Sequence, residues 1–101
     1  MNDLSGPIGL CIRARACSFG YENALKMLQK GKSYLVIVSD DASEGTKKRM
    51  TDKCKSYDTD IAVLDIRDTL NKLKVKKEVK IISINDENFK KLFDKRLKGE
   101  T

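Results

Sequence analysis

The sequence predicts an α/β fold in which one sheet carries helices on both of its faces. Short apolar runs typical of buried strands alternate with segments whose apolar residues recur every three to four positions, as on one side of a helix. Hydrophobic residues make up 40% of the 101 residues, which is enough for one core, and no linker or repeat interrupts the alternation. We therefore expect a single domain over residues 1–101.

The first part of the chain predicts a helix, a brief strand and a second helix. Ser5 can cap the first helix, and Pro7 fits its first turn, where a missing N–H costs nothing. Residues 16–19 are apolar and short, which indicates a brief edge strand. The second helix is expected over residues 21–30, because Gly31 readily adopts the left-handed conformation that ends many helices.

The middle of the chain predicts the central strand and a third helix. Residues 35–38, LVIV, are typical of a strand buried on both faces. Either Asp41 or Ser43 can cap the helix that follows, and Asp41 with Glu44 fits a capping box. The inward stripe of this helix, at spacings of four and three, is Thr46, Met50, Cys54 and Tyr57.

The last part of the chain predicts two more strands, each followed by a helix. The strands are residues 61–64 and 79–84, both rich in β-branched residues. Asp65 can cap a short helix between them, and Asn85 can cap the final helix. The apolar anchors are Ile66, Leu70 and Leu73 in the short helix and Phe89, Leu92 and Phe93 in the final one.

Composition argues against catalysis and against a bound cofactor. The chain has no His, which removes the commonest general base and the commonest metal ligand, and it has no P-loop or Gly-rich dinucleotide turn. Cys11, Cys17 and Cys54 form no Cys-x-x-Cys pair, which indicates reduced, buried thiols. Asp40 and Asp41 fit capping better than a metal pair. We expect no enzyme activity, metal, cofactor or small-molecule substrate.

The charge of the chain favours a polyanionic partner. Lys and Arg number 21 against 15 acidic residues, a formal net charge of +6, which suits RNA. No apolar run approaches the length of a membrane span, and the first residues do not form a secretory signal. We therefore expect a cytoplasmic monomer with no membrane partner.

Three stretches give the sequence a family likeness. They are GLCIRARACSFGYENALKMLQKGKSYLVIVSDDAS at residues 9–43, TKKRMTDKCKSYD at 46–58 and IISIND at 81–86. Together they resemble the kink-turn RNA-binding superfamily of archaeal and eukaryotic large-subunit ribosomal proteins, and within it a small bacterial branch often called YlxQ. The resemblance implies a three-layer α/β/α sandwich around a four-stranded mixed sheet. It also implies binding of structured, ribosomal or other RNA.

The resemblance further implies an RNA-binding surface made of two segments at one end of the sheet. One segment is the helix start after a glycine, with a lysine one turn on, and the other is the loop before the last strand. The free N–H groups of a helix start attract phosphate, and a glycine lets the backbone approach it closely. The residues implied in RNA binding are Gly20, Tyr21, Glu22, Asn23, Lys26, Val75, Lys76 and Lys77.

Several alternatives stay open at this level. Glu22-Asn23 stand where kink-turn readers usually carry Asn-Glu or Lys-Gln, so Glu22 either accepts from a guanine edge or repels phosphate. Tyr21 can stack on a base or simply cover its helix, and Lys26 can be an ordinary surface residue. The lysines of the third helix fit surface charge better than a contact surface. The alternative function is a protein-interaction module of the translation machinery that does not touch RNA.

Overall fold

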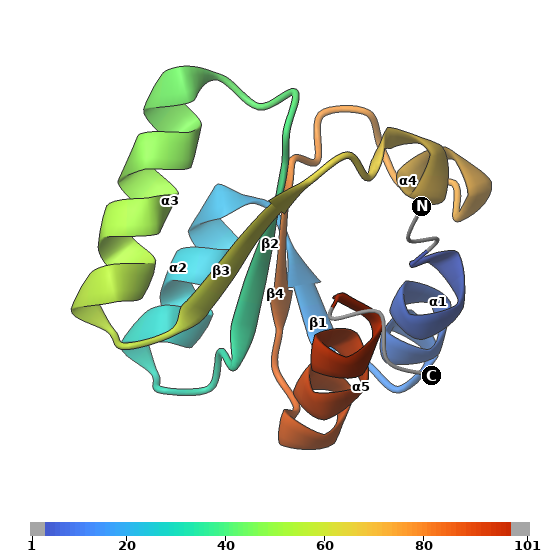
Figure 1. Ribbon diagram of the computed structural model, residues 1–101, viewed down its shortest axis with the longest axis horizontal. Coiled ribbons are helices and arrows are strands. Elements are labelled where there is room, and N and C mark those ends of the chain that lie inside the picture. Colours follow the sequence, from blue (N-terminus) through green and yellow to red (C-terminus); the bar gives the residue numbers. More distant parts are fainter. Residues whose placement is uncertain (1–3, 98–101) are drawn as a thin grey trace.

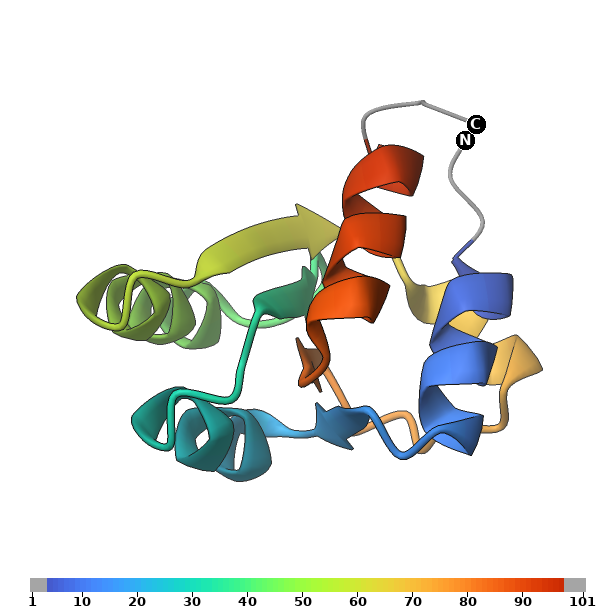
Figure 2. The same cartoon turned by 90° about the horizontal axis from the view of Figure 1, so that it is seen from below.

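The computed structural model describes residues 4–97, which form an α/β fold around one four-stranded mixed sheet (Figure 1). In chain order the elements are α1 (Ser5–Arg13), β1 (Cys17–Phe19), α2 (Tyr21–Gln29), β2 (Leu35–Ser39), α3 (Glu44–Ser56), β3 (Asp60–Leu64), α4 (Arg67–Lys72), β4 (Ile81–Ile84) and α5 (Glu87–Leu97). Helices α1, α4 and α5 cover one face of the sheet and α2 and α3 the other (Figure 2). The predicted three-layer sandwich is confirmed.

The order of the strands across the sheet is β1-β4-β2-β3. Strand β4 runs antiparallel to both of its neighbours, whereas β2 and β3 are parallel. Strands β1, β2 and β3 therefore run in one direction and β4 in the other. Strand β2 lies inside the sheet and all five of its residues are buried, as predicted for the apolar run LVIV.

Alternate residues of the two inner strands supply two separate cores. Leu35 and Ile37 of β2 pack under α1, α4 and α5, while Val36 and Val38 pack under α2 and α3. The predicted inward stripe of α3 is only partly right. Its members Met50 and Cys54 are fully buried, but Thr46 is half-buried and Tyr57, just past the helix, is 42% exposed.

The predicted starts of three elements can be compared with the structure. Of the two predicted caps of α3, Ser43 is confirmed and Asp41 is not, because the Oγ of Ser43 accepts from the N–H of Thr46 at 3.2 Å. Asp86, not Asn85, caps α5: its Oδ1 accepts from the N–H groups of Asn88 and Phe89 at 2.8 and 3.2 Å. Strand β4 begins at Ile81, two residues after the predicted start.

The start of α1 also differs from the prediction. The helix begins at Ser5 itself, so Leu4 takes the cap position and no side chain caps the helix there. The buried Leu4 side chain instead anchors this start in the core under α1, α4 and α5. The boundaries of β1 and α2 agree with the prediction to within one residue, and Gly31, just past the end of α2, has a φ of +71°.

The three cysteines are free thiols, as predicted. Cys11 and Cys54 are buried and Cys17 is half-buried. Burial raises the pKa of the Cys54 thiol to about 11, so this group stays protonated and unreactive at neutral pH. Among residues 4–97, no helix has the length and apolar character needed to cross a membrane.

Candidate nucleic-acid interface

The fold brings the two segments of the predicted interface to the same edge of the sheet. Strands β1, β2 and β3 end at this edge, and β4 begins there, because it runs the opposite way. The chain leaves β1 through Gly20 into α2, and it reaches β4 through the loop that contains residues 75–80. The N–H of Gly20 donates to the carbonyl of Ile81 at 2.8 Å and ties the two segments together.

Gly20 has a conformation that other residues rarely adopt. Its φ is +92° and its ψ 161°, and an added Cβ would meet no atom within 4 Å. Glycine is therefore favoured here by the positive φ of the backbone, and not by a lack of space for a side chain. No side chain of the described residues caps the helix at this position, so the first N–H groups of α2 are open in the sense that no capping side chain accepts from them.

The polar residues of the first turns of α2 differ in the hydrogen bonds that they already make within the protein. Glu22, Asn23 and Lys26 are exposed. The Nδ2 of Asn23 donates to the carbonyl of Phe19 at 3.0 Å, which leaves its Oδ1 and its second N–H for a ligand. Lys26 makes no ion pair with any residue in the range 4–97.

Tyr21, the first residue of α2, is covered on one side. It packs against the core under α2 and α3, and the guanidinium carbon of Arg49 lies 5.6 Å from the centre of its ring. Arg49 comes from α3, a helix for which the sequence favoured surface charge over a contact surface. Of the two predicted roles of Tyr21, covering its helix agrees with these contacts.

The loop before β4 presents two cations and one anchored apolar residue. Val75 is half-buried against the core under α4, and its N–H donates to the carbonyl of Leu70 at 2.9 Å. Lys76 and Lys77 are exposed and have no ion pair within the described part of the chain. The loop is thus held at its base while its two lysines point into solvent.

A pocket of about 210 Å³ opens beside this loop. Its apolar wall consists of Leu70, Val75 and Val79, and its rim carries three cations. The other lining residues are Ser39, Asp41, Arg67, Asn71, Lys77 and Lys80. An apolar wall with a charged rim suits a flat, partly polar ring better than a free ion.

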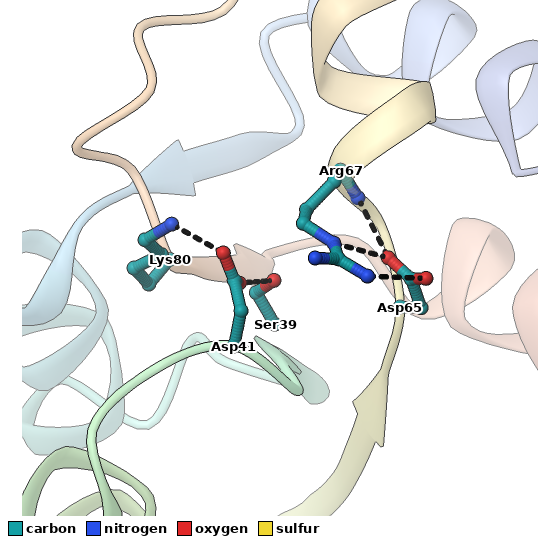
Figure 3. Close-up of polar contacts among 5 residues, drawn as sticks. All are labelled: Ser39, Asp41, Asp65, Arg67 and Lys80. Carbon is teal, nitrogen blue, oxygen red and sulfur yellow. Dashed lines mark hydrogen bonds and ion pairs between the residues drawn. The ribbon is translucent and has the colours of Figure 1, made fainter.

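Two ion pairs shape this edge (Figure 3). Asp41 accepts from Lys80 at 2.7 Å and also from the hydroxyl of Ser39, and these bonds lower the pKa of Asp41 to about 2. Asp65 accepts from the Nε and Nη2 of Arg67 at 3.0 and 3.1 Å, which lowers the pKa of Asp65 and raises that of Arg67. Both carboxyl groups are therefore ionised at neutral pH, and each is paired with a cation, Asp41 with Lys80 and Asp65 with Arg67.

Sequence reasoning missed three residues of this edge: Arg49, Arg67 and Lys80. One of the ion pairs had a local signal in the sequence, the Asp-x-Arg spacing at residues 65–67. Side chains two residues apart are near enough to bond when the backbone turns between them. The ion pair of Lys80 with Asp41 has no local signal in the sequence, because the two residues are 39 positions apart. Within residues 4–97, no cluster of three His, Cys, Asp or Glu is placed to hold a metal ion.

Comparison with known proteins gives the chain its family. The model of the ribosomal protein L7Ae/L30e/S12e/Gadd45 family matches residues 8–93. A Bacillus subtilis protein named RNA-binding protein YlxQ is 29% identical over 82 residues, 81% of this chain and 82% of that protein. A protein of the same name from Enterococcus faecium is 30% identical over 92 residues, 91% of this chain and 88% of its own length.

Solved structures with the same fold cover nearly the whole chain. A Bacillus halodurans protein of unknown function superposes with a TM-score of 0.86 at 33% identity, over 97% of this chain and 99% of its own. The 15.5kD RNA binding protein of Giardia lamblia superposes with a TM-score of 0.75 at 18% identity, over 96% of this chain and 83% of its own, and shows the shared fold. The chain therefore belongs to the ribosomal protein L7Ae/L30e/S12e/Gadd45 family.

Proposed function

We propose that this protein binds structured RNA as a non-catalytic component associated with the ribosome or with translation. The contact surface is the start of α2, with Lys26 one turn on, together with the loop before β4. The names of the Bacillus and Enterococcus relatives support an RNA partner. The net charge of +6 supports a polyanionic one.

The observation that carries the proposal is the hydrogen bond between Gly20 and Ile81. It links Gly20, just before α2, to Ile81, the first residue of β4 after the loop, which supports one surface made of both segments. Lys26, Lys76 and Lys77 are exposed there without an ion-pair partner among the described residues, so their charges are available to phosphate. RNA readers combine such phosphate contacts with contacts to unstacked bases.

The pocket beside the loop gives an unstacked base a place to bind. Leu70, Val75 and Val79 offer an apolar wall for the face of the ring. Arg67 and Lys80 stand at the rim, where their N–H groups can meet base carbonyls or the adjoining phosphate. A base that leaves its stack in a bent or looped RNA fits here, whereas a regular duplex does not present one.

The experiment that tests the proposal is a filter-binding titration with total cellular RNA over a range of salt concentrations. Because phosphate contacts release counterions, the logarithm of the binding constant should fall linearly with the logarithm of the salt concentration. An absence of affinity even at low salt would favour the alternative, a protein-interaction module that does not touch RNA. Crosslinking in cells followed by sequencing then identifies the RNA.

The role of Glu22 separates general from selective binding. This carboxylate is exposed in the first turn of α2, beside the open N–H groups. If Glu22→Lys tightens binding to unselected RNA, the carboxylate acts against phosphate. If the same substitution abolishes binding to one crosslinked RNA, Glu22 accepts from a base of that RNA.

A further inference from the structure

Arg49 and Tyr21 form a contact between α3 and α2 next to the proposed RNA surface. The guanidinium carbon lies 5.6 Å from the centre of the Tyr21 ring, a distance at which a cation is attracted to the ring face. Tyr21 is half-buried and also packs against the core under α2 and α3. The ring face under Arg49 is therefore closed to a nucleobase, while the guanidinium above it is exposed.

The guanidinium is fixed in orientation but has most of its donors free. Its Nε donates to the carbonyl of Gly45, one turn earlier in α3, at 3.3 Å. The four N–H bonds on the two Nη atoms have no hydrogen bond, and Arg49 makes no ion pair within residues 4–97. A planar pair of such donors matches two oxygens of one phosphate.

The position of Arg49 places this charge at the edge where RNA is proposed to bind. Helices α2 and α3 both begin at the edge where β1 and β2 end, and Tyr21 directly follows Gly20. Lys53 lies one turn beyond Arg49 on the same flank of α3. Lys48 and Lys55, seven residues apart, lie instead on the outward side of the helix, away from the buried Met50.

Resting on the proposed function, we propose that Arg49 binds a phosphodiester of the RNA strand that passes the start of α2. The RNA interface then continues from α2 onto the flank of α3 that carries Arg49 and Lys53. Tyr21 is in this arrangement a positioning residue, which holds the guanidinium flat and does not itself stack on a base. This assignment differs from a general attraction by surface lysines, because only one side of α3 takes part.

The test compares Arg49→Ala with Lys48→Ala, which removes the same charge from the same helix on its outward side. Arg49→Ala should weaken binding of total cellular RNA about tenfold and lower the salt slope by about one unit, as expected for one lost phosphate contact. Lys48→Ala should change the affinity by less than about twofold, because its charge stays far from the strand. Thermal unfolding of both variants should match that of the wild type.

Substitutions at the pair separate charge from geometry. Arg49→Lys keeps the charge but loses the planar fork, so the salt slope should stay while the affinity falls. Tyr21→Phe keeps the ring and should bind like the wild type. Tyr21→Leu keeps the apolar packing and removes the ring, so it should weaken binding in the wild type and have no further effect in Arg49→Ala.

The outcomes distinguish this proposal from the proposed function. If Lys26→Ala weakens binding and Arg49→Ala does not, RNA binds at α2 without α3, and the role of Arg49 is refuted. Equal losses from Arg49→Ala and Lys48→Ala would also refute it, because the attraction would then be diffuse. If the wild type has no affinity for RNA, the proposed function fails first.

Discussion

The two ends of the sheet hold different polar residues and use them in opposite ways. At the end where β4 finishes, the Oγ of Ser83 lies 2.8 Å from the Oγ of Ser33 and 2.7 Å from the Oδ1 of Asn85. Because a hydroxyl has one proton, Ser83 donates to Asn85 and accepts from Ser33. The Nδ2 of Asn85 donates in turn to the Oγ of Ser18 at 2.8 Å. This chain of bonds is closed within the protein.

At the other end the polar groups face outward. The pairs Asp41–Lys80 and Asp65–Arg67 are partly or largely exposed, and Lys76 and Lys77 have no ion pair in the part of the chain that the structure describes. Within residues 4–97, no buried side-chain nitrogen or oxygen lacks a hydrogen-bond partner. The groups at the first end thus bond to one another inside the protein, whereas Lys76 and Lys77 at the open end are exposed and have no ion-pair partner among the described residues.

The largest expected effect breaks the closed network. Asn85→Leu should lower the free energy of unfolding by about 2–4 kcal/mol, because it leaves the hydroxyls of the buried Ser83 and the half-buried Ser18 without their partner. Asn88→Leu is the matched control on the exposed side of α5 and should be nearly neutral. Chemical denaturation measures both. Equal stability of the two variants would show that the hydrogen bonds of Asn85 with Ser18 and Ser83 do not stabilise the fold.

A second test uses the two glycines that bracket α2 at opposite ends of the sheet. Gly20 and Gly31 have φ of +92° and +71°, so Gly20→Val and Gly31→Val should each cost about 1–3 kcal/mol in backbone strain. Only Gly20→Val should also weaken RNA binding, because its branched side chain blocks approach to the start of α2. A loss of RNA affinity in Gly31→Val as large as in Gly20→Val would mean that strain alone explains the effect.

A third test concerns affinity and leaves stability unchanged. Lys26→Ala and the double variant Lys76→Ala/Lys77→Ala should each weaken RNA binding and lower the salt slope, by about one unit for each lost phosphate contact. The control Lys48→Ala/Lys55→Ala removes two charges from the outward side of α3. If the control loses as much affinity as the loop variant, the charge acts diffusely and the proposed surface is wrong.

The sequence predicted the elements of the fold well, because strands and helices follow from local periodicity. The run LVIV gave a fully buried β2, and the α3 residues Met50 and Cys54 face the core as their spacing predicts. Ser43 caps α3 as one of the two predicted alternatives, whereas Asp41 and Asn85 do not act as caps, for a different reason. Asp41 and Asn85 each have a competing long-range partner, Lys80 for the first and Ser18 for the second, and local patterns contain no information about such pairs.

The candidate interface was predictable only in part. The likeness to a family indicated the start of α2 and the loop before β4, and the topology brings both to one edge. The pocket beside the loop requires residues from β2, α4 and the segment before β4 to converge, so no single stretch reveals it. The contact of Arg49 with Tyr21 is equally invisible, because it depends on how α3 packs beside α2.

The smallest expected effect is a change of stability with pH at the open end. The bond from Lys80 and the bond from Ser39 lower the pKa of Asp41 from its ordinary 3.8 to about 2. A carboxyl whose pKa is lower in the folded state stabilises the fold fully above 3.8, and this contribution disappears as the pH falls from 3.8 toward 2. The effect should be small, because the pair is exposed to solvent, unlike the network around Asn85.

A double-mutant cycle with Asp41→Asn and Lys80→Met measures this contribution directly. Thermal unfolding at neutral pH should give a small favourable coupling between Asp41 and Lys80, because the carboxylate is charged and accepts from the ammonium at 2.7 Å. The coupling should vanish as the pH approaches 2, where the carboxyl takes up a proton. A coupling that is unchanged at acid pH, or as large as the cost of Asn85→Leu, would show that the open end also holds the fold together.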